Sequence, residues 1–382
     1  MKYLSRLALA LILTTPALPS SAAAGLSCTW PLWVHEWGVH VFDGGGSPIA
    51  SGLIPDFFYR DGPSRPRPTA VRDMPRDNGL RELPVIHFYS PATAAVPVGV
   101  EVGFTQGAAT TWYPDVDLRR PAGAIAGPLS KSSWAMLTGR QDSNRELVWD
   151  RLELTATPTS PAALTQSPWI TQARAIPQAR WVNRANESER FVFYEGSTSE
   201  EVPLTITRSA RYSAKARSYV VTNAGKHPIH DVMIIHREGP IARLVTIRSL
   251  AAAASAPFTI DGPHQPKLVE KATAYLRDAL VDPKMPTPPD PNALPAGSCG
   301  IHDNPGIPFD TAADHRIYRG EVELILDTWR PRFFEADGTT IIYREDAATI
   351  AEAMPLSIYT DTQSYAVIHR AGLALWQNVL LP

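Results

Sequence analysis

One run near the start of the chain, residues 30–42, constrains the fold more than any other feature. Its residues alternate between two sides: Trp33, His35, Trp37, Val39 and Val41 on one side, and Val34, Glu36, Gly38, His40 and Phe42 on the other. Successive side chains of a β-strand point to opposite faces of its sheet, and tryptophan and valine are enriched in strands. The run therefore predicts a long β-strand, which ends at the glycines 44–46.

Further short apolar runs are separated by turn residues, and they predict strands over 83–89, 96–104, 145–155, 191–194, 202–207, 218–223, 232–236 and 244–247. A turn at Ser90-Pro91 predicts that the first two of these form a hairpin. The five strands from 191 to 247 suit a β-sandwich. Proline is abundant (36 of 382 residues) and charged residues are few (19%), which favours a loop-rich β protein over a helical bundle.

The last third of the chain changes character. Apolar residues spaced four apart predict a helix over 267–281, and shorter helices are predicted over 170–180, 319–329 and 346–354. Asp337-Gly338, flanked by apolar pairs, predicts another hairpin. We therefore expect a mainly β, β-sandwich-rich fold with a C-terminal α+β segment. The expected division is a signal peptide (1–24), an N-terminal β domain (25–165), a central β-sandwich (166–262) and an α+β segment that packs back (263–382).

The first residues predict export. Lys2 and Arg6 precede an apolar run over 7–13, and the small residues 22–24 provide a cleavage site after Ala24. The apolar run is too short for a membrane anchor, which needs about 20 residues. A lipid anchor on Cys28 is an alternative. A lipid-attachment motif has an aliphatic residue three positions before the cysteine, however, and this chain has Gly25 there. No later stretch is long and apolar enough to cross a bilayer, so we expect a periplasmic or extracellular protein.

The chain has two cysteines, Cys28 and Cys299, and both remain after the expected cleavage. In an oxidising compartment they predict one disulfide between the mature N-terminus and a late loop. Two free thiols, one of them catalytic, are the alternative. Cys299 stands in Ala-Gly-Ser-Cys-Gly, which is the composition of a loop and not of an activated thiol at a helix start.

Charge and motifs exclude several functions. The formal net charge is −2 with both signs interspersed, which gives no electrostatic basis for binding nucleic acid or an anionic membrane. A phosphate loop, a dinucleotide fingerprint and a Gly-x-Ser-x-Gly elbow are all absent, so we predict no cofactor and identify no nucleophile motif.

The segment Val34-His35-Glu36-Trp37-Gly38 resembles the signature of a family of uncharacterised bacterial secreted proteins, called here the HEWG family. Residues 169–196 and 323–358 are similar to its middle and C-terminal blocks. The resemblance implies one continuous protein and not a fusion. It brings no fold, substrate or catalytic residues, and His40 stands where a threonine or another small residue is expected.

His35-Glu36 superficially matches a zinc protease, but the motif His-Glu-x-x-His needs a helix. Here the next histidine is His40, five positions on, in a predicted strand. His35 and Glu36 are therefore catalytic candidates only as the lining of a pocket that displaces their pKa values. The alternative is a core histidine with a satisfied hydrogen bond and a glutamate paired with an arginine.

Two other kinds of site remain candidates. His302, Asp303 and His315 have ligand side chains on one long loop, although their spacing matches no known metal site. Carboxylates paired as in a glycosidase are a further alternative: Glu36 with Asp43, Asp56, Asp115 or Asp117.

Tryptophans give the last candidate site. Trp33, Trp37 and Trp112 either fill a wide core, which we favour, or form an exposed surface on which sugar rings stack. From these features we expect a non-catalytic exported module that binds a glycan or another envelope component through an aromatic patch. The rival is a hydrolase, metal-dependent or not, whose site includes His35 and Glu36.

Overall fold

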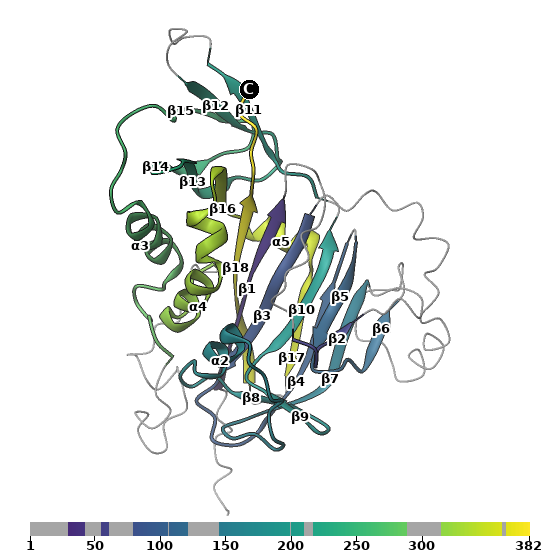
Figure 1. The fold of residues 1–382 in the computed structure, drawn as a ribbon. Helices are drawn as coiled ribbons and strands as arrows, with labels where there is room; N and C mark the ends of the chain where they lie inside the picture. Colours follow the sequence, from purple (N-terminus) through teal and green to yellow (C-terminus); the bar gives the residue numbers. More distant parts are fainter. Residues whose placement is uncertain are drawn as a thin grey trace, which may run out of the picture.

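The computed structural model describes residues 30–42, 55–60, 79–105, 107–120, 145–198, 200–209, 217–288, 315–360 and 364–382. These residues form a mainly β fold with three sheets and several helices, which confirms the predicted fold class (Figure 1). The signal peptide, Cys28, Cys299, His302 and Asp303 all lie outside the described residues, so the predicted disulfide and the export signal stay predictions.

A nine-stranded sheet forms the centre of the molecule. Its strands are, in spatial order, β14 (Ile241–Leu250), β13 (Ile229–Glu238), β16 (Gly338–Arg344), β18 (Ser364–Trp376), β1 (Trp30–Phe42), β3 (Gly79–Tyr89), β10 (Val192–Thr198), β5 (Gly107–Tyr113) and β2 (Tyr59–Arg60). β1 has the predicted bounds. It pairs in parallel with β18 along its whole length and antiparallel with β3. The sheet therefore joins the first and the last described strands at its middle.

Two smaller sheets cover one face of the central sheet. The six-stranded sheet contains β17 (Leu356–Thr360), β4 (Val96–Gly103), β7 (Glu146–Thr155), β8 (Trp181–Arg184), β9 (Glu187–Glu189) and, beside β7, β6 (Leu118–Arg120). The three-stranded sheet contains β11 (Leu204–Arg208), β12 (Ser218–Asn223) and β15 (Ser255–Thr259). Each has its own apolar contact with the central sheet, and the short helix α5 (Ala347–Ala353) lies on the same side.

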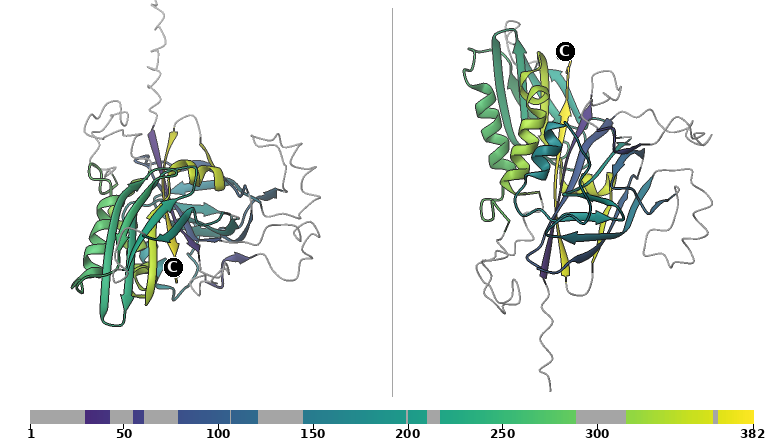
Figure 2. Two further views of the ribbon diagram at one scale, coloured as in Figure 1. Left: turned by 90° about the horizontal axis from the view of Figure 1, so that it is seen from above. Right: turned by 60° about the horizontal axis from the view of Figure 1, so that its bottom comes forward.

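Helices cover the other face (Figures 1 and 2). They are α2 (Pro168–Arg174), α3 (Leu268–Leu280), α4 (Arg319–Arg330) and the π-helical turn η4 (Pro331–Glu335). In α3 the buried residues are the four that the spacing predicted: Leu268, Ala272, Leu276 and Leu280. A stripe with this spacing faces one side of a helix, which here packs on the sheet. The predictions for 267–281, 319–329 and 346–354 are confirmed.

Two predicted hairpins are wrong. Strands β3 and β4 belong to different sheets, because the chain after Tyr89 crosses from the central layer to the next one instead of turning back. Phe333 and Phe334 are buried in η4, which continues α4 and packs against Trp329, so no strand precedes Asp337-Gly338. In both cases the partner of the strand was set by packing between layers and not by the local turn residues.

Sheet pairing crosses both predicted domain boundaries. β7 pairs with β8 across position 165, and β13 pairs with β16 across position 262. The five strands predicted between 191 and 247 are all present, distributed over the nine-stranded and the three-stranded sheets. The exact division into domains stays a prediction.

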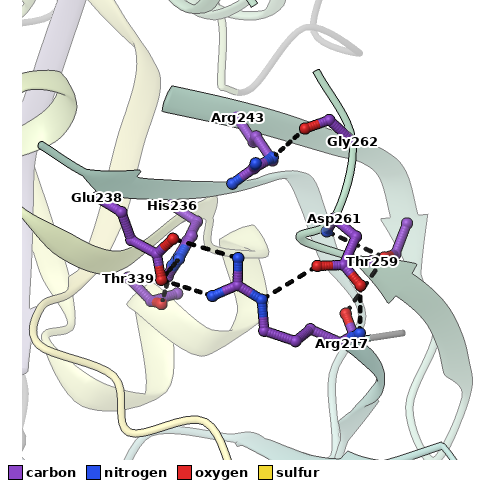
Figure 3. Close-up of polar contacts among 8 residues, drawn as sticks. All are labelled: Arg217, His236, Glu238, Arg243, Thr259, Asp261, Gly262 and Thr339. Carbon is purple, nitrogen blue, oxygen red and sulfur yellow. Dashed lines mark hydrogen bonds and ion pairs between the residues drawn. The ribbon is translucent and has the colours of Figure 1, made fainter. Parts of the chain in front are cut away.

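A polar network joins the three-stranded sheet to β13 (Figure 3). Arg217 donates to Glu238 Oε1 from Nη1 (2.5 Å) and to Asp261 Oδ1 from Nε (3.1 Å). On β13, His236 contacts both Glu238 and Thr339 of β16. Arg217 lowers the pKa of Glu238 to about 2 through these hydrogen bonds, with a further contribution from His236. The network fixes the small sheet against the strands that carry the cleft described below.

Candidate functional site

The two faces of β1 carry different chemistry. His35 points to the helical layer, where Trp33 and Trp37 join the largest apolar core, whereas Glu36 points to the six-stranded sheet. His40 lies on the same face as Glu36, near the end of the strand. The prediction that His35 and His40 face opposite sides is confirmed. A site that includes both His35 and Glu36 is wrong, because adjacent residues of an extended strand cannot share one pocket.

His35 belongs to a row of three histidines on neighbouring strands. His87 of β3 and His369 of β18 are its direct cross-strand partners, and all three are buried. His35 Nδ1 donates to Glu321 Oε2 of α4 (2.7 Å), and His87 Nδ1 lies within ion-pair range of Glu321 Oε1 (3.3 Å). His369 Nδ1 donates to the carbonyl oxygen of Arg316 (2.9 Å). One carboxylate therefore joins the sheet to the helical layer.

The electrostatics of this row centre on the buried carboxyl of Glu321. Burial raises the pKa of Glu321, but the charge and hydrogen bond of His35, together with His87, outweigh burial and lower it to about 2. Tyr89 and Tyr318 pack against the His35 ring, and burial raises the pKa of both phenols well above the usual value. Glu321 is 0% and His35 1% exposed. These groups are enclosed in the core, so we assign them to stability.

Glu36 is satisfied in the way that the alternative reading of the sequence expected. Its carboxylate accepts hydrogen bonds from the Tyr194 hydroxyl and from two nitrogens of the Arg370 guanidinium. Glu36 is 4% exposed and has only a cavity of about 20 Å³ beside it. A carboxylate held by these partners has a structural role, and its oxygens are already occupied by the hydrogen bonds of Tyr194 and Arg370.

The three candidate tryptophans are core residues. Trp33 and Trp37 lie in the core below the helices, whereas Trp112 lies on the opposite side of the central sheet, and none is more than 2% exposed. The prediction that they bind a ligand on the surface is wrong, since layers on both faces of the sheet cover them. The favoured interpretation, that tryptophans fill a wide core, is confirmed for these three.

The metal candidates gain no support. Two of the three, His302 and Asp303, lie outside the described residues, and only His315 lies within them. In the described part of the chain, no three His, Cys, Asp or Glu side chains are placed so that they could hold one metal ion. Likewise, no helix in that part is long and apolar enough to span a bilayer.

A cleft of about 550 Å³ opens on the Glu36 face of the sheet, at the end of β1. Its lining comes from β1, β13, β16, α5 and the connections that follow β4, β10, β12 and β16: His40, Phe42, Thr105, Glu200, Glu201, Pro203, Gly225, Lys226, His227, Ile229, Tyr343, Glu345, Thr349, Glu352 and Ala353. The volume lies within the range of ligand pockets, roughly 300–1,000 Å³. The cleft forms where the two smaller sheets and α5 leave part of the central sheet uncovered.

His40 is the central polar group of this cleft. Its Nδ1 lies 3.4 Å from Glu345 Oε1, and its Nε2 lies 3.1 Å from Thr198 Oγ1 and 4.0 Å from Glu200 Oε2. When Nδ1 donates to Glu345, Nε2 is the acceptor on the other side of the ring. His40 and Glu345 are almost fully buried, 1% and 4% exposed, while Glu200 is 33% exposed. A carboxylate thus orients a histidine beside an accessible carboxylate.

Carboxylates dominate the charge of the cleft. Glu352 is neutralised by Lys226 and His227, and the Lys226 hydrogen bond lowers the pKa of Glu352. Glu200, Glu201 and Glu345 contribute three further acidic groups among the described lining residues, and His40 contributes a second imidazole beside that of His227. Phe42, Ile229 and Tyr343 provide apolar walls. The arrangement favours a ligand that combines a positive charge with an apolar part.

The partners of His35 in the histidine row and of His40 in the cleft were not predicted from the sequence. His87 and His369 stand inside apolar strands (VIHFY and VIHR), and a lone histidine in such a run is a detectable signal of a buried polar contact. Glu345 precedes the N-cap of α5, Asp346, whose side chain accepts from the Ala348 amide (2.9 Å), and no pattern in the sequence distinguishes Glu345 from a surface residue at a helix start. No sequence spacing links His40 to Glu345, because they are 305 residues apart.

Comparisons with known proteins add no function. The sequence matches no family model and no curated protein, so the resemblance to the HEWG family stays a prediction. A mu homology domain of Fcho1 from Danio rerio with bound Eps15 peptide is 8% identical, with 93% of this chain and 97% of that chain covered and a TM-score of 0.29. The mu-homology domain of yeast delta-COP-I complexed with a Dsl1 WxWxV peptide is 9% identical, with coverage of 92% and 98% and a TM-score of 0.32. Similarity at this level carries no argument.

Proposed function

We propose that this chain is an exported binding protein whose ligand site is the cleft around His40. The observation that carries the proposal is the convergence of His40, Glu345 and Glu200 on a cavity of about 550 Å³. Convergent polar groups in an otherwise apolar concavity are the usual mark of a small-molecule site. Export rests on the sequence of residues 1–24.

The charge of the lining defines the ligand class. Among the described lining residues, carboxylates outnumber cations, and such a lining attracts a positively charged ligand and disfavours an anion. The ligand we propose is a primary amine with an apolar or sugar-ring body, such as an amino sugar of a cell-envelope glycan. The proposed ligand class still includes a glycan, as the sequence analysis predicted. The proposed site, however, is the cleft and not the three tryptophans.

Calorimetric titration tests the proposal, with ethanolamine, 1,4-diaminobutane and the glucosamine disaccharide as probes. The N-acetylglucosamine disaccharide serves as an uncharged control. We expect an amine to bind, and Glu345→Gln to weaken that binding by at least about tenfold, because a charge-assisted hydrogen bond is lost. Glu335→Gln, an exposed carboxylate that pairs with Arg330 away from the cleft, is the matched control. Equal binding of charged and acetylated sugars, or no binding of any amine, would refute the proposal.

One observation favours a second function, hydrolysis in the same cleft. Glu345, His40 and Thr198 form a carboxylate–histidine–hydroxyl chain, with contacts of 3.4 and 3.1 Å. In this arrangement the carboxylate orients the imidazole, and His40 Nε2 accepts a proton from the hydroxyl or from water. Turnover of p-nitrophenyl acetate that disappears in His40→Gln and persists in His227→Gln would support a hydrolase. Equal rates in the two variants would exclude His40 as its base.

A further inference from the structure

A second, smaller cavity lies on the other face of the central sheet, near the opposite end of β1. It has a volume of about 150 Å³, and its lining includes Trp33, Tyr89, Ser90, Arg180 and Arg190. Trp33 and His40 are seven residues apart on one strand, or roughly 23 Å at the usual rise, and they point to opposite faces. The cavity is therefore separate from the cleft proposed above.

Two arginines reach this cavity, and neither forms an ion pair with a carboxylate of the described residues, although the charge of Glu189 acts on Arg190. Arg180 is 6% exposed, and its only side-chain hydrogen bonds in the described structure run from Nη2 to the carbonyl oxygens of Ala92 (2.7 Å) and Ala94 (3.1 Å). Arg190 donates from Nη1 to the carbonyl oxygen of Ile176 (2.8 Å) and lies over the Trp181 ring. The Nε atoms of both are buried and have no hydrogen-bond partner.

Other arginines of the same region contrast with this pair. Arg174 forms a bidentate ion pair with Glu189, and Arg184 pairs with Asp117 (3.0 Å). Carbonyl oxygens satisfy a donor but do not neutralise its charge, and a buried charge is usually paired. Burial accordingly lowers the pKa of both Arg180 and Arg190. One further donor stands at the cavity, since the Ser90 oxygen accepts from the Ala92 amide and keeps its own hydrogen to donate.

We propose that this cavity binds a small oxyanion, a carboxylate or a phosphate group, through Arg180 and Arg190. A guanidinium offers parallel N–H donors that match the two oxygens of such a group. The anion supplies a countercharge in direct contact with the two guanidinium groups, which no ion pair among the described residues provides, and the Ser90 hydroxyl donates to one of its remaining oxygens. Trp33 closes one side, which limits the ligand to a small anion or to the anionic end of a larger molecule.

Thermal unfolding and calorimetric titration of the purified protein test this site, with sodium phosphate, sulfate and acetate compared to sodium chloride at equal ionic strength. We expect at least one oxyanion to raise the melting temperature above that in chloride. Arg190→Lys, which keeps the charge but loses the parallel donors, is expected to weaken binding at least tenfold. The double variant Arg180→Gln, Arg190→Gln is expected to abolish it. Arg151→Lys, whose parent arginine is 83% exposed, is the matched control.

The outcomes separate cleanly. Arg180 also holds the chain after β3, so a double variant that fails to fold leaves the decision to Arg190→Lys, which keeps the positive charge and whose folding is checked by its melting temperature in chloride. Phosphate binding without acetate binding would identify a phosphate ligand, and the reverse would identify a carboxylate. No difference between the oxyanions and chloride, or an unchanged affinity in Arg190→Lys, would overturn the proposal.

Discussion

At the scale of single residues, Glu321 is the most consequential side chain of the described core. It comes from α4 and is fully buried between His35 and His87 of two adjacent strands. Replacing a buried pair with apolar groups is often neutral, but removing one partner leaves a buried charge unpaired and is strongly destabilising. The helical layer is thus attached to the sheet by a charge as well as by apolar contact.

Glu321→Gln is expected to lower the free energy of unfolding by about 2 kcal/mol, the scale for losing buried hydrogen bonds to a charged group. Urea denaturation followed by tryptophan fluorescence measures the change. Glu323→Gln is the control from the same helix: its partly exposed pair with Arg277 is worth less than about 1 kcal/mol. Similar losses in the two variants would show that Glu321 is not a special contact.

The same carboxyl predicts an acid transition. Since folding lowers the pKa of Glu321 from 4.5 to about 2, its contribution to stability is complete above pH 4.5. That contribution is lost progressively as the pH falls toward 2, because the unfolded state takes up a proton more readily. Unfolding free energies measured at several pH values should fall over this interval in the wild type, and less steeply in Glu321→Gln. Parallel curves would contradict the assignment.

At the scale of elements, β10 pairs irregularly with both of its neighbouring strands. Its pairing shifts register before Gly196 on both sides, against β3 and against β5. A Cβ at Gly196 would lie 2.3 Å from Phe104 Cε1 and 2.7 Å from the Ala108 carbonyl oxygen. Glycine is therefore required here by close approach, a common role of glycine at a bulge.

Gly196→Ala is expected to destabilise the protein by about 1–3 kcal/mol through overpacking. Gly99→Ala in β4 is the matched control, because its added Cβ would meet only ordinary contacts at 3.6 Å. Thermal unfolding of the two variants measures the difference. An alanine at 196 that is tolerated as well as one at 99 would show that the bulge has room.

Local patterns predicted individual elements well and their partners poorly. The alternation of residues 30–42 predicted the bounds of β1 within a residue or two. The apolar residues that recur every four positions from Leu268 did the same for α3. Neither pattern carries information on which strand lies beside which, so β3 and β4 were paired wrongly. The candidate site failed for the same reason: His40 was visible in the sequence, but its partner Glu345 is brought to it only by the order β16-β18-β1.

At the scale of the whole molecule, the central sheet depends on its last strand. β18 lies between β16 and β1, and it buries Ala371, Leu373 and Leu375 against the helices. Its removal would leave two unpaired strand edges in the middle of the sheet and expose apolar surface on both faces. Folding of the described residues therefore requires that strand.

A chain truncated before Ser364 is expected to lack a cooperative thermal transition and native near-ultraviolet circular dichroism. A chain ending at Leu380, which removes only two residues beyond an exposed leucine, is expected to keep both. Limited proteolysis gives an independent measurement, with rapid digestion expected for the first chain only. A cooperative transition in the chain truncated before Ser364 would show that the remaining strands can form the sheet alone.

The parallel pairing of β1 with β18 also determines how the molecule resists force. The chain enters the ladder at Trp30 and leaves it at Trp376, which lie at opposite ends of the two strands. Tension applied between these points slides one strand along the other. All the hydrogen bonds between the two strands then share the load, instead of breaking one after another as in a peeled hairpin. A chain pulled in this direction is expected to yield at high force and in one step, with its central pair as the mechanical clamp.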